Sequence, residues 1–317
     1  MPLATSIRSV RVAVVDIGTN STRLLLADVD PSDGSIAELA RRSRVTRLGH
    51  GVDASGRLDD ESVERTWQVL EDYRGEIEES GCEANLAVLT SAVRDASNGP
   101  EFAQRVRDEL SFDAKVLSGD EEAQLTFLGA MAGRGPAEEP TVVIDIGGGS
   151  TEFVVGTGRT AGFHVSTPAG VVRMTERHIH SDPPKPAEIR ALGNDTREVF
   201  LTHIPEDERV PVRRGIAVAG TATSAASIEQ ELEPYDPARV HGHRLLLATV
   251  ELLLARLSEM TEAERREVAG LHPDRAPTIV AGMVLLSEAM IVMGLEEVEV
   301  SEHDILYGGA LRLAGLG

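Results

Sequence analysis

Two segments of the chain repeat one design, and this repeat restricts the folds that the sequence can adopt. In each copy an apolar, β-branched run ends in an aspartate, turns through glycine into hydroxyl residues, and continues as a second apolar run. Residues 12–27 are the first copy, with Asp16 at the end of the first run, and residues 142–155 are the second, with Asp145 in the same place. Two strands joined by a short glycine turn form a β-hairpin. A duplicated hairpin therefore predicts two related α/β domains.

The two turns predict a phosphate site. Glycine lets backbone N–H groups approach an oxygen-rich ligand without a Cβ in the way, and the hydroxyl groups add donors. A single Asp-x-Gly is more typical of a tight turn whose aspartate bonds its own backbone. Two matched copies favour a functional role, with the loops facing each other across a cleft between the domains. The candidate phosphate-binding residues of the turns are Gly18, Thr19, Asn20, Ser21, Gly147, Gly148, Gly149, Ser150 and Thr151.

The aspartates at the strand ends predict a metal ion. Asp16 and Asp145 would repel a bare polyanion, but each can hold a hydrated Mg²⁺ that bridges to a phosphate. Mn²⁺ has the same preference for oxygen ligands and stays an alternative. We therefore expect a clamp of metal and phosphate built from both hairpins.

The size and charge of the chain exclude several classes of protein. Its 317 residues, 41% of them hydrophobic, suffice for two domains, which we place at 1–127 with 305–317 and at 128–304. A formal net charge of −21 argues against a nucleic-acid-binding surface. We expect no membrane association and a cytoplasmic location, because no apolar run is long enough to span a bilayer and no secretory signal is evident. The single cysteine, Cys82, excludes an internal disulfide.

Apolar periodicity predicts the remaining elements. Residues 59–80 form a helix with Val63, Trp67, Leu70 and Ile77 on one face.

In the second half, further helices are predicted over residues 245–260, 261–270, 275–293 and 304–316. The stretch 133–140, rich in Gly, Pro and Glu, predicts a connector between the halves.

Several polar residues outside the turns are candidates for chemistry. Ser118 precedes three acidic residues at the start of a predicted helix, where a capping role is ordinary. A carboxylate facing a phosphate site could instead deprotonate a water, and we expect that base to be Glu121 or Glu122. Arg94 and Arg23 are candidates to neutralise charge on the transferred phosphoryl group, with surface ion pairs as the alternative.

A third Gly/Thr cluster follows a predicted strand near residue 219. Gly220 and Thr221 suit a phosphate or nucleoside contact, although a helix N-cap explains them nearly as well.

With these motifs in place, the chain resembles the exopolyphosphatase and guanosine pentaphosphatase (Ppx/GppA) family, in its shorter two-domain form. That family shares the ribonuclease H-like superfold of actin, hexokinase and the heat-shock chaperone ATPases. The segments that carry the resemblance are Asp16–Ser21, Thr90–Ala96 with Asn98, Gly119–Ala123, Asp145–Glu152, Gly220–Thr223 and Arg275 followed by Ala281 and Gly282.

The resemblance implies Mg²⁺-dependent hydrolysis of the terminal phosphoanhydride of inorganic polyphosphate. It assigns the catalytic carboxylate to Glu122, the metal to Asp16, Asp145 and Glu152, and phosphate contacts to Arg94 and Arg275. One departure is the C-terminal motif, where Leu306 and Tyr307 stand in place of the family's usual Arg-Glu pair.

Three other functions stay open at this point. Hydrolysis of guanosine pentaphosphate to the tetraphosphate would use the same site. A sugar-kinase-type enzyme shares both hairpins, but the Glu-Glu-Ala motif argues against it. A non-catalytic sensor of polyphosphate or alarmone is a third class. Without the helical domains of longer relatives, we expect a preference for shorter polyphosphate or help from a partner or homodimer.

Overall fold

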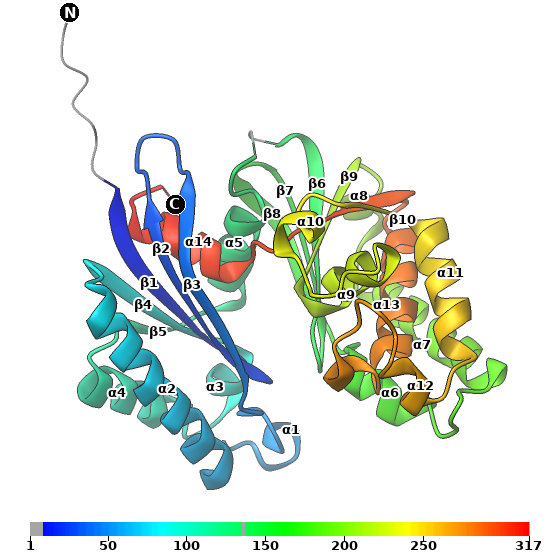
Figure 1. The fold of residues 1–317 in the computed structure, drawn as a ribbon, viewed down its shortest axis with the longest axis horizontal. Helices are drawn as coiled ribbons and strands as arrows, with labels where there is room; N and C mark the ends of the chain where they lie inside the picture. Colours follow the sequence, from blue (N-terminus) through cyan, green and yellow to red (C-terminus); the bar gives the residue numbers. More distant parts are fainter. Residues whose placement is uncertain (1–8, 135–136, 317) are drawn as a thin grey trace, which may run out of the picture. The chain divides into compact units, whose positions relative to one another are not determined.

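The computed structural model of the chain describes residues 9–134 and 137–316. These fold as two compact units, the first formed by Met1–Gly135 with Asp304–Gly317 and the second by Pro136–His303. Each unit is built on one sheet, and each is described here by itself (Figure 1).

The first unit has a five-stranded sheet in the order β3-β2-β1-β4-β5. β1, β2 and β3 form an antiparallel meander, whereas β4 and β5 run parallel to β1. The strands are β1 (Val10–Ile17), β2 (Ser21–Val29), β3 (Ile36–Val45), β4 (Ala84–Leu89) and β5 (Ala114–Val116). The helices of this unit are α1 (Val52–Ser55), α2 (Asp60–Ser80), α3 (Ser91–Asp95), α4 (Gly99–Leu110), α5 (Gly119–Ala130) and α14 (Ile305–Leu313).

Helices cover both faces of this sheet. Side chains alternate across a strand, so Val15 of β1 packs into the cluster beneath α2 and α4 while Val14 packs into the cluster beneath α14. The helix α14 brings the end of the chain back to the first unit because it fits closely against α5. A Cβ at Gly129 would lie 1.8 Å from the carbonyl oxygen of Asp304, and one at Gly308 would lie 1.9 Å from that of Leu125.

The second unit has a six-stranded sheet in the order β10-β11-β9-β6-β7-β8. The strands are β6 (Ala137–Ile146), β7 (Thr151–Gly158), β8 (Thr160–Thr167), β9 (Arg214–Val218), β10 (Arg244–Leu246) and β11 (Glu297–Val300). Its core repeats that of the first unit, since β6, β7 and β8 form an antiparallel meander and β9 runs parallel to β6. The predicted fold class, two duplicated α/β domains of the ribonuclease H-like kind, is thereby confirmed.

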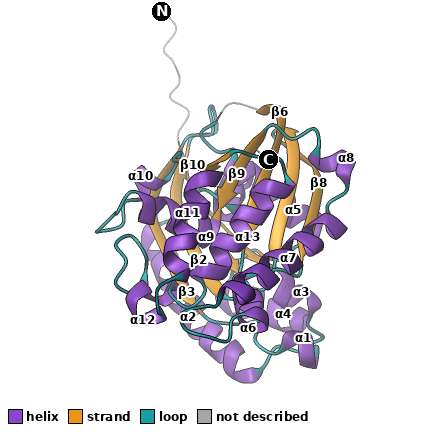
Figure 2. Cartoon of the chain, turned by 90° about the vertical axis from the view of Figure 1, so that its right-hand side faces the viewer, coloured by secondary structure: helices purple, strands orange, loops and turns teal. Residues whose placement is uncertain are grey.

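Helices of the second unit pack over its sheet, as Figure 2 shows for α7, α9, α11 and α13. They are α6 (Val171–His178), α7 (Pro186–His203), α8 (Glu206–Arg209), α9 (Ala219–Glu229), α10 (Pro237–Val240), α11 (Leu247–Ser258), α12 (Glu262–Arg265) and α13 (Ile279–Val292), with a 3-10 turn at Pro273–Arg275. Phe153 of β7 meets Phe200 of α7 edge to face at 4.9 Å between ring centroids, in the centre of this core.

Both predicted hairpins are present, as β1–β2 and β6–β7. The helix predicted over residues 59–80 is confirmed as α2, which buries Trp67, Leu70 and Ile77. Its N-terminus is capped by Asp59, whose carboxylate accepts the backbone N–H of Glu61.

Four expected boundaries are wrong. The helix predicted from residue 245 begins at Leu247, because Arg244–Leu246 pairs with β11 as a strand and tertiary pairing overrides the helical propensity of leucine. The helix predicted from residue 275 begins at Ile279, since Pro277 is tolerated only outside or at the very start of a helix. The helix predicted over 261–270 extends only over Glu262–Arg265, and the connector predicted over 133–140 gives way to β6 at Ala137.

Within the described residues, none of the helices combines the length and apolar character needed to cross a bilayer.

Candidate functional site

The two predicted turns have the same internal hydrogen bond. Gly18 donates its N–H to the carbonyl of Ser21 at 3.0 Å, and Gly147 donates to Ser150 at 2.9 Å. A Cβ added at Gly18 would lie 3.0 Å from the carbonyl oxygen of Ser21. A Cβ added at Gly147 would lie 3.3 Å from the carbonyl oxygen of Ser150. A side chain at either position would be a tight fit, so glycine favours this approach, and the sequence repeat corresponds to a repeat in conformation.

In the first unit, residues 46–49 support the turn from behind. The carbonyl of Thr19 accepts the N–H of Gly49 at 2.8 Å, and the carbonyl of Asn20 accepts those of Thr46 and Arg47 at 3.0 and 2.9 Å. A trans peptide unit points its C=O and N–H in opposite directions. The N–H of Asn20 is thus directed away from this support, on the side where an anion could bind.

In the second unit, the start of α6 supports the turn in the same way. The carbonyl of Gly147 accepts the N–H of Val171, and that of Gly148 accepts the N–H of Val172, both at 2.9 Å. The contact is close, because a Cβ at Gly170 would lie 2.4 Å from backbone atoms of the turn. By the same peptide geometry, the N–H groups of Gly148 and Gly149 are directed away from α6.

The aspartate of the first hairpin is paired with an arginine. Asp16 lies opposite Arg23 across the hairpin, and its Oδ2 accepts Nε and Nη2 of that arginine at 2.9 and 2.7 Å. Arg23 also donates to Asp304 at the start of α14. Asp16 and Asp304 are 5% and 2% exposed, so that two buried carboxylates share one guanidinium. Burial raises the pKa of Asp304, but Arg23 and Arg41 outweigh burial and hold that pKa below its usual value.

The second hairpin has a carboxylate where the first has an arginine. Asp145 lies opposite Glu152 in the register of β6 and β7. The Oε1 atom of Glu152 accepts the hydroxyls of Ser150 at 2.5 Å and Ser166 at 2.8 Å. Two carboxylates on one face of a sheet supply the oxygen ligands that Mg²⁺ prefers. This pair therefore fits a cation better than Asp16, whose carboxylate is already bound to a guanidinium.

The described residues contain no group of three His, Cys, Asp or Glu side chains arranged to hold a metal ion. Mg²⁺ commonly binds through one or two carboxylates and completes its coordination with water and substrate phosphates. Asp145 and Glu152 thus provide the donor set that such an ion uses.

Arg94 and Glu122 form an ion pair in the first unit. Arg94, on α3, donates Nη1 to Oε2 of Glu122 at 2.9 Å and to the carbonyl of Leu117 at 3.0 Å. Ser118 caps α5, as expected, and the Glu121 carboxylate accepts its N–H at 2.9 Å in a capping box. That hydrogen bond is the main reason why the pKa of Glu121 lies below its usual range. The two glutamates therefore differ, since Glu121 closes the helix end and Glu122 faces an arginine.

The Gly/Thr cluster opens the helix α9 and lies against Arg275. Ala219, its first residue, has a left-handed φ of 61°, which is disfavoured for a residue with a Cβ. A Cβ at Gly220 would come within 1.5 Å of a guanidinium nitrogen of Arg275. Because Gly220 has no side chain, the guanidinium of Arg275 can lie against it at the end of the strand.

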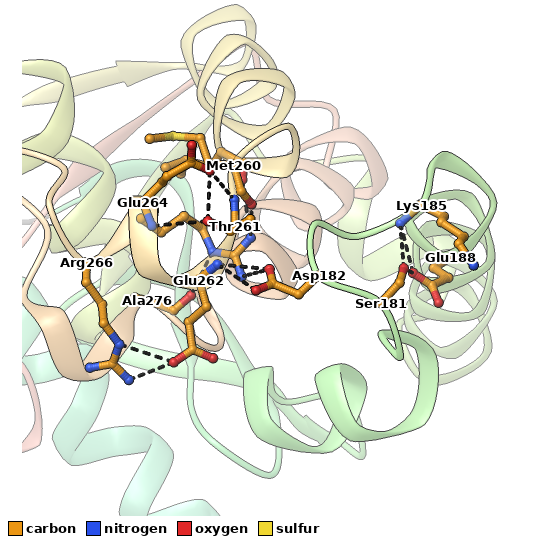
Figure 3. Close-up of polar contacts among 12 residues, drawn as sticks. Ser181, Asp182, Lys185, Glu188, Met260, Thr261, Glu262, Glu264, Arg266 and Ala276 are labelled. Atoms are coloured by element: carbon orange, nitrogen blue, oxygen red, sulfur yellow. Dashed lines mark hydrogen bonds and ion pairs between the residues drawn. The ribbon is translucent and has the colours of Figure 1, made fainter.

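A buried arginine holds the segment that carries Arg275. Arg265, 4% exposed, donates to the carbonyls of Met260 at 2.7 Å and Ala276 at 3.0 Å. Asp182 accepts the N–H of Glu262 at 2.8 Å next to it (Figure 3). The backbone carbonyl next to Arg275 is therefore held by a buried side chain of α12.

Two of the predicted phosphate-binding side chains are buried. Thr151 is fully buried and donates its hydroxyl to the carbonyl of Ala169 at 2.5 Å. Thr221 is also buried. Its methyl group packs against Gly282 of α13, where an added Cβ would lie 3.0 Å from it. The hydroxyl of Thr151 is therefore bonded to the backbone inside the unit, whereas Thr19 and Asn20 are exposed.

Two residues that complete this arrangement were not found from the sequence. Ser166 is identified only from the pairing of β7 with β8, which places it opposite Glu152. Asp304 lies 281 positions from its partner Arg23 along the chain. No local feature of the sequence indicated that Asp304 would be the partner of Arg23.

Comparison with known proteins identifies the group to which the chain belongs. The sequence profile of the Ppx/GppA phosphatase family matches residues 29–312. The chain belongs to the Ppx/GppA phosphatase family. Its relatives include "Exopolyphosphatase 2" of Mycobacterium tuberculosis, 39% identical over 319 residues that cover 96% of this chain and 99% of the relative.

Solved structures of the family have the same fold. The Aquifex aeolicus member of the Ppx/GppA family superposes with a TM-score of 0.84 at 31% identity, covering 97% of both chains. A protein described as an exopolyphosphatase from Cytophaga hutchinsonii superposes with a TM-score of 0.83 at 26% identity, over 97% of this chain and 99% of the other.

Proposed function

We propose that this Ppx/GppA protein is an exopolyphosphatase, which hydrolyses the terminal phosphoanhydride of inorganic polyphosphate and releases orthophosphate. The near full-length relationship to a mycobacterial exopolyphosphatase supports this substrate class. The observation on which the chemistry rests is the pairing of Glu122 with Arg94, because it joins a candidate base to a cation that suits a phosphoryl group.

Glu122 is the proposed general base. It takes a proton from a water molecule whose oxygen attacks the terminal phosphorus, while the bond from that phosphorus to the bridging oxygen breaks and its electron pair leaves with the shortened chain. The guanidinium of Arg94 lies beside this carboxylate, with Nη1 at 2.9 Å from Oε2 of Glu122. The same guanidinium can then stabilise charge on the phosphoryl oxygens, where stabilisation has its greatest effect.

The backbone of the two turns is proposed to bind phosphate oxygens. The N–H groups of Asn20, Gly148 and Gly149 are held in fixed directions by the supporting segments described above, so they need no rearrangement when an anion binds. Arg275 adds a cation beside the third cluster.

Asp145 and Glu152 are proposed to hold Mg²⁺, with Mn²⁺ as the alternative. When bound, such an ion supplies charge neutralisation for the phosphate oxygens. Ser150 and Ser166 orient the Glu152 carboxylate for this role, as hydrogen-bond partners of metal ligands commonly do.

The test is phosphate release from tripolyphosphate, long-chain polyphosphate and guanosine pentaphosphate in the presence of Mg²⁺. Wild type is compared with Glu122→Gln and with Glu121→Gln, a matched control one residue away. We expect release from polyphosphate, lost in Glu122→Gln and largely kept in Glu121→Gln. Release that survives Glu122→Gln would contradict the mechanism. Release from guanosine pentaphosphate alone would move the substrate to the alarmone, and tight binding without release would favour a sensor.

A further inference from the structure

Arg47, just after β3, has a backbone conformation that is unusual for its residue type. Its φ is 52°, in the left-handed region that is disfavoured for residues other than Gly, Asn and Asp. Glycine would adopt this conformation without steric cost. A non-glycine residue in a strained conformation near a functional loop suggests that its side chain has a use.

The first phosphate turn determines this conformation. The N–H groups of Thr46 and Arg47 both donate to the carbonyl of Asn20, and that of Gly49 donates to Thr19. The segment is further fixed by Thr46, whose hydroxyl bonds the buried hydroxyl of Thr22 at 3.0 Å. The backbone of Arg47 is therefore held rigidly against the turn.

The side chain of Arg47 is exposed, and its guanidinium takes part in no hydrogen bond or ion pair within the described ranges 9–134 and 137–316. Some nearby arginines are paired, although the exposed guanidinium of Arg44 on β3 also has no hydrogen bond or ion pair among the described residues. Arg42 pairs with Glu76 at 3.1 Å and Arg65 with Glu61 at 2.8 Å. In a chain with a net charge of −21, a cation that is left unpaired beside a phosphate turn is well placed to meet an incoming anion.

The geometry points to a second phosphate subsite at Arg47, which rests on the proposed function and extends it. The guanidinium binds phosphates of the polyphosphate chain that lie beyond the terminal residue held by the turn. A guanidinium suits this role because its planar fork matches two phosphate oxygens at once. With this subsite, the affinity for polyphosphate depends on the length of the phosphate chain.

Arg47→Gly is the decisive variant, because it removes the charge while relieving the strained φ. A merely structural residue would then give a more stable protein with unchanged kinetics. Ser111→Gly is the control for the backbone, since Ser111 has a similar φ of 58° at the end of α4. Arg256→Ala, on the exposed side of α11, is the control for charge.

The measurements are kcat and KM for tripolyphosphate and for long-chain polyphosphate, together with thermal unfolding. We expect Arg47→Gly to raise the unfolding midpoint as Ser111→Gly does, and to lower kcat/KM for the long chain about tenfold, the effect of losing one charge-assisted hydrogen-bonded contact. For tripolyphosphate, kcat/KM should fall less than about twofold, which corresponds to a small fraction of the free energy of that contact. Arg47→Lys should keep only part of the long-chain activity, because its ammonium group retains the charge but not the planar fork.

Equal losses on both substrates would overturn the subsite, because they would indicate damage to the turn itself. Unchanged long-chain kinetics would also overturn it. If wild type releases phosphate from no polyphosphate, the proposed function fails, and calorimetric binding of long-chain polyphosphate to wild type and Arg47→Gly still decides about Arg47. Weaker binding of the variant, with a log–log salt slope reduced by about 0.7, supports the subsite, and equal or absent binding overturns it.

Discussion

Glu152 lies directly opposite Asp145 in the hairpin of the second unit, where the hairpin of the first unit has Arg23 opposite Asp16. The two repeats therefore share a backbone but differ in charge. An arginine neutralises the aspartate of the first hairpin, whereas two carboxylates of the second lie on one face of the sheet. This asymmetry supports the proposal that the second unit holds the metal, whereas the first has an ion pair at the same place.

Cation binding should accordingly depend on Glu152 and not on Asp16. We expect Glu152→Gln to weaken Mn²⁺ binding by at least about tenfold, because one of two opposed carboxylates is removed. Titration of the protein with Mn²⁺, followed by electron paramagnetic resonance, measures this without substrate. Asp16→Asn is the control, and a larger loss of Mn²⁺ affinity in that variant would contradict the assignment.

The ion pair between Arg23 and Asp304 should stabilise the fold. Asn at residue 304 can still cap α14 through the N–H of Leu306 but loses the charge. We expect Asp304→Asn to lower the free energy of unfolding by about 2 kcal/mol at neutral pH, since Arg23 loses one of its two carboxylate partners and keeps Asp16. Asp28→Asn, at the more exposed pair with Arg11, should cost far less in the same urea titrations.

The same carboxylate predicts a pH dependence. Because the pKa of Asp304 is lowered in the folded protein, its contribution is complete above the unfolded pKa of about 3.9 and is lost as the pH falls through the folded value. The difference in stability between wild type and Asp304→Asn should therefore shrink on acidification below about pH 4. A difference that stays constant down to strongly acidic pH would show that the charge is not responsible.

Glu121 should matter for stability more than for catalysis. Glu121→Ala removes the carboxylate from the capping box with Ser118 and should lower the free energy of unfolding by about 1 kcal/mol. Thermal unfolding measures this loss, and phosphate release should stay within a few-fold of wild type. A loss of release as large as that of Glu122→Gln would instead place Glu121 in the chemistry.

Gly220 should act through Arg275. A methyl group at residue 220 would overlap the guanidinium and displace it, so Gly220→Ala should raise KM for polyphosphate. If displacement is the whole effect, the double variant Gly220→Ala/Arg275→Ala should be no worse than Arg275→Ala alone. Steady-state kinetics of the four proteins give the coupling, and additive losses would show that Gly220 has a separate role.

Local patterns predicted the elements that carry the site. The hairpins followed from β-branched runs around glycine, and the cap at Ser118 followed from its place before the acidic residues that open the helix. The start of α11 was misplaced because the pairing of Arg244–Leu246 with β11 joins distant segments. The start of α13 was misplaced although the sequence contained the signal, since Pro277 marks the boundary.

The sequence by itself determined the duplicated hairpin, its glycine turns and the acidic residues at the strand ends, because these depend on contacts within a few residues. Only the tertiary structure decided which partner each charge has. Asp304 reaches Arg23 because α14 packs on the first sheet, and Ser166 reaches Glu152 because β8 pairs with β7 in one register. The turns are likewise set by support from residues 46–49 and from α6, and such packing between separate elements is not encoded in any local period.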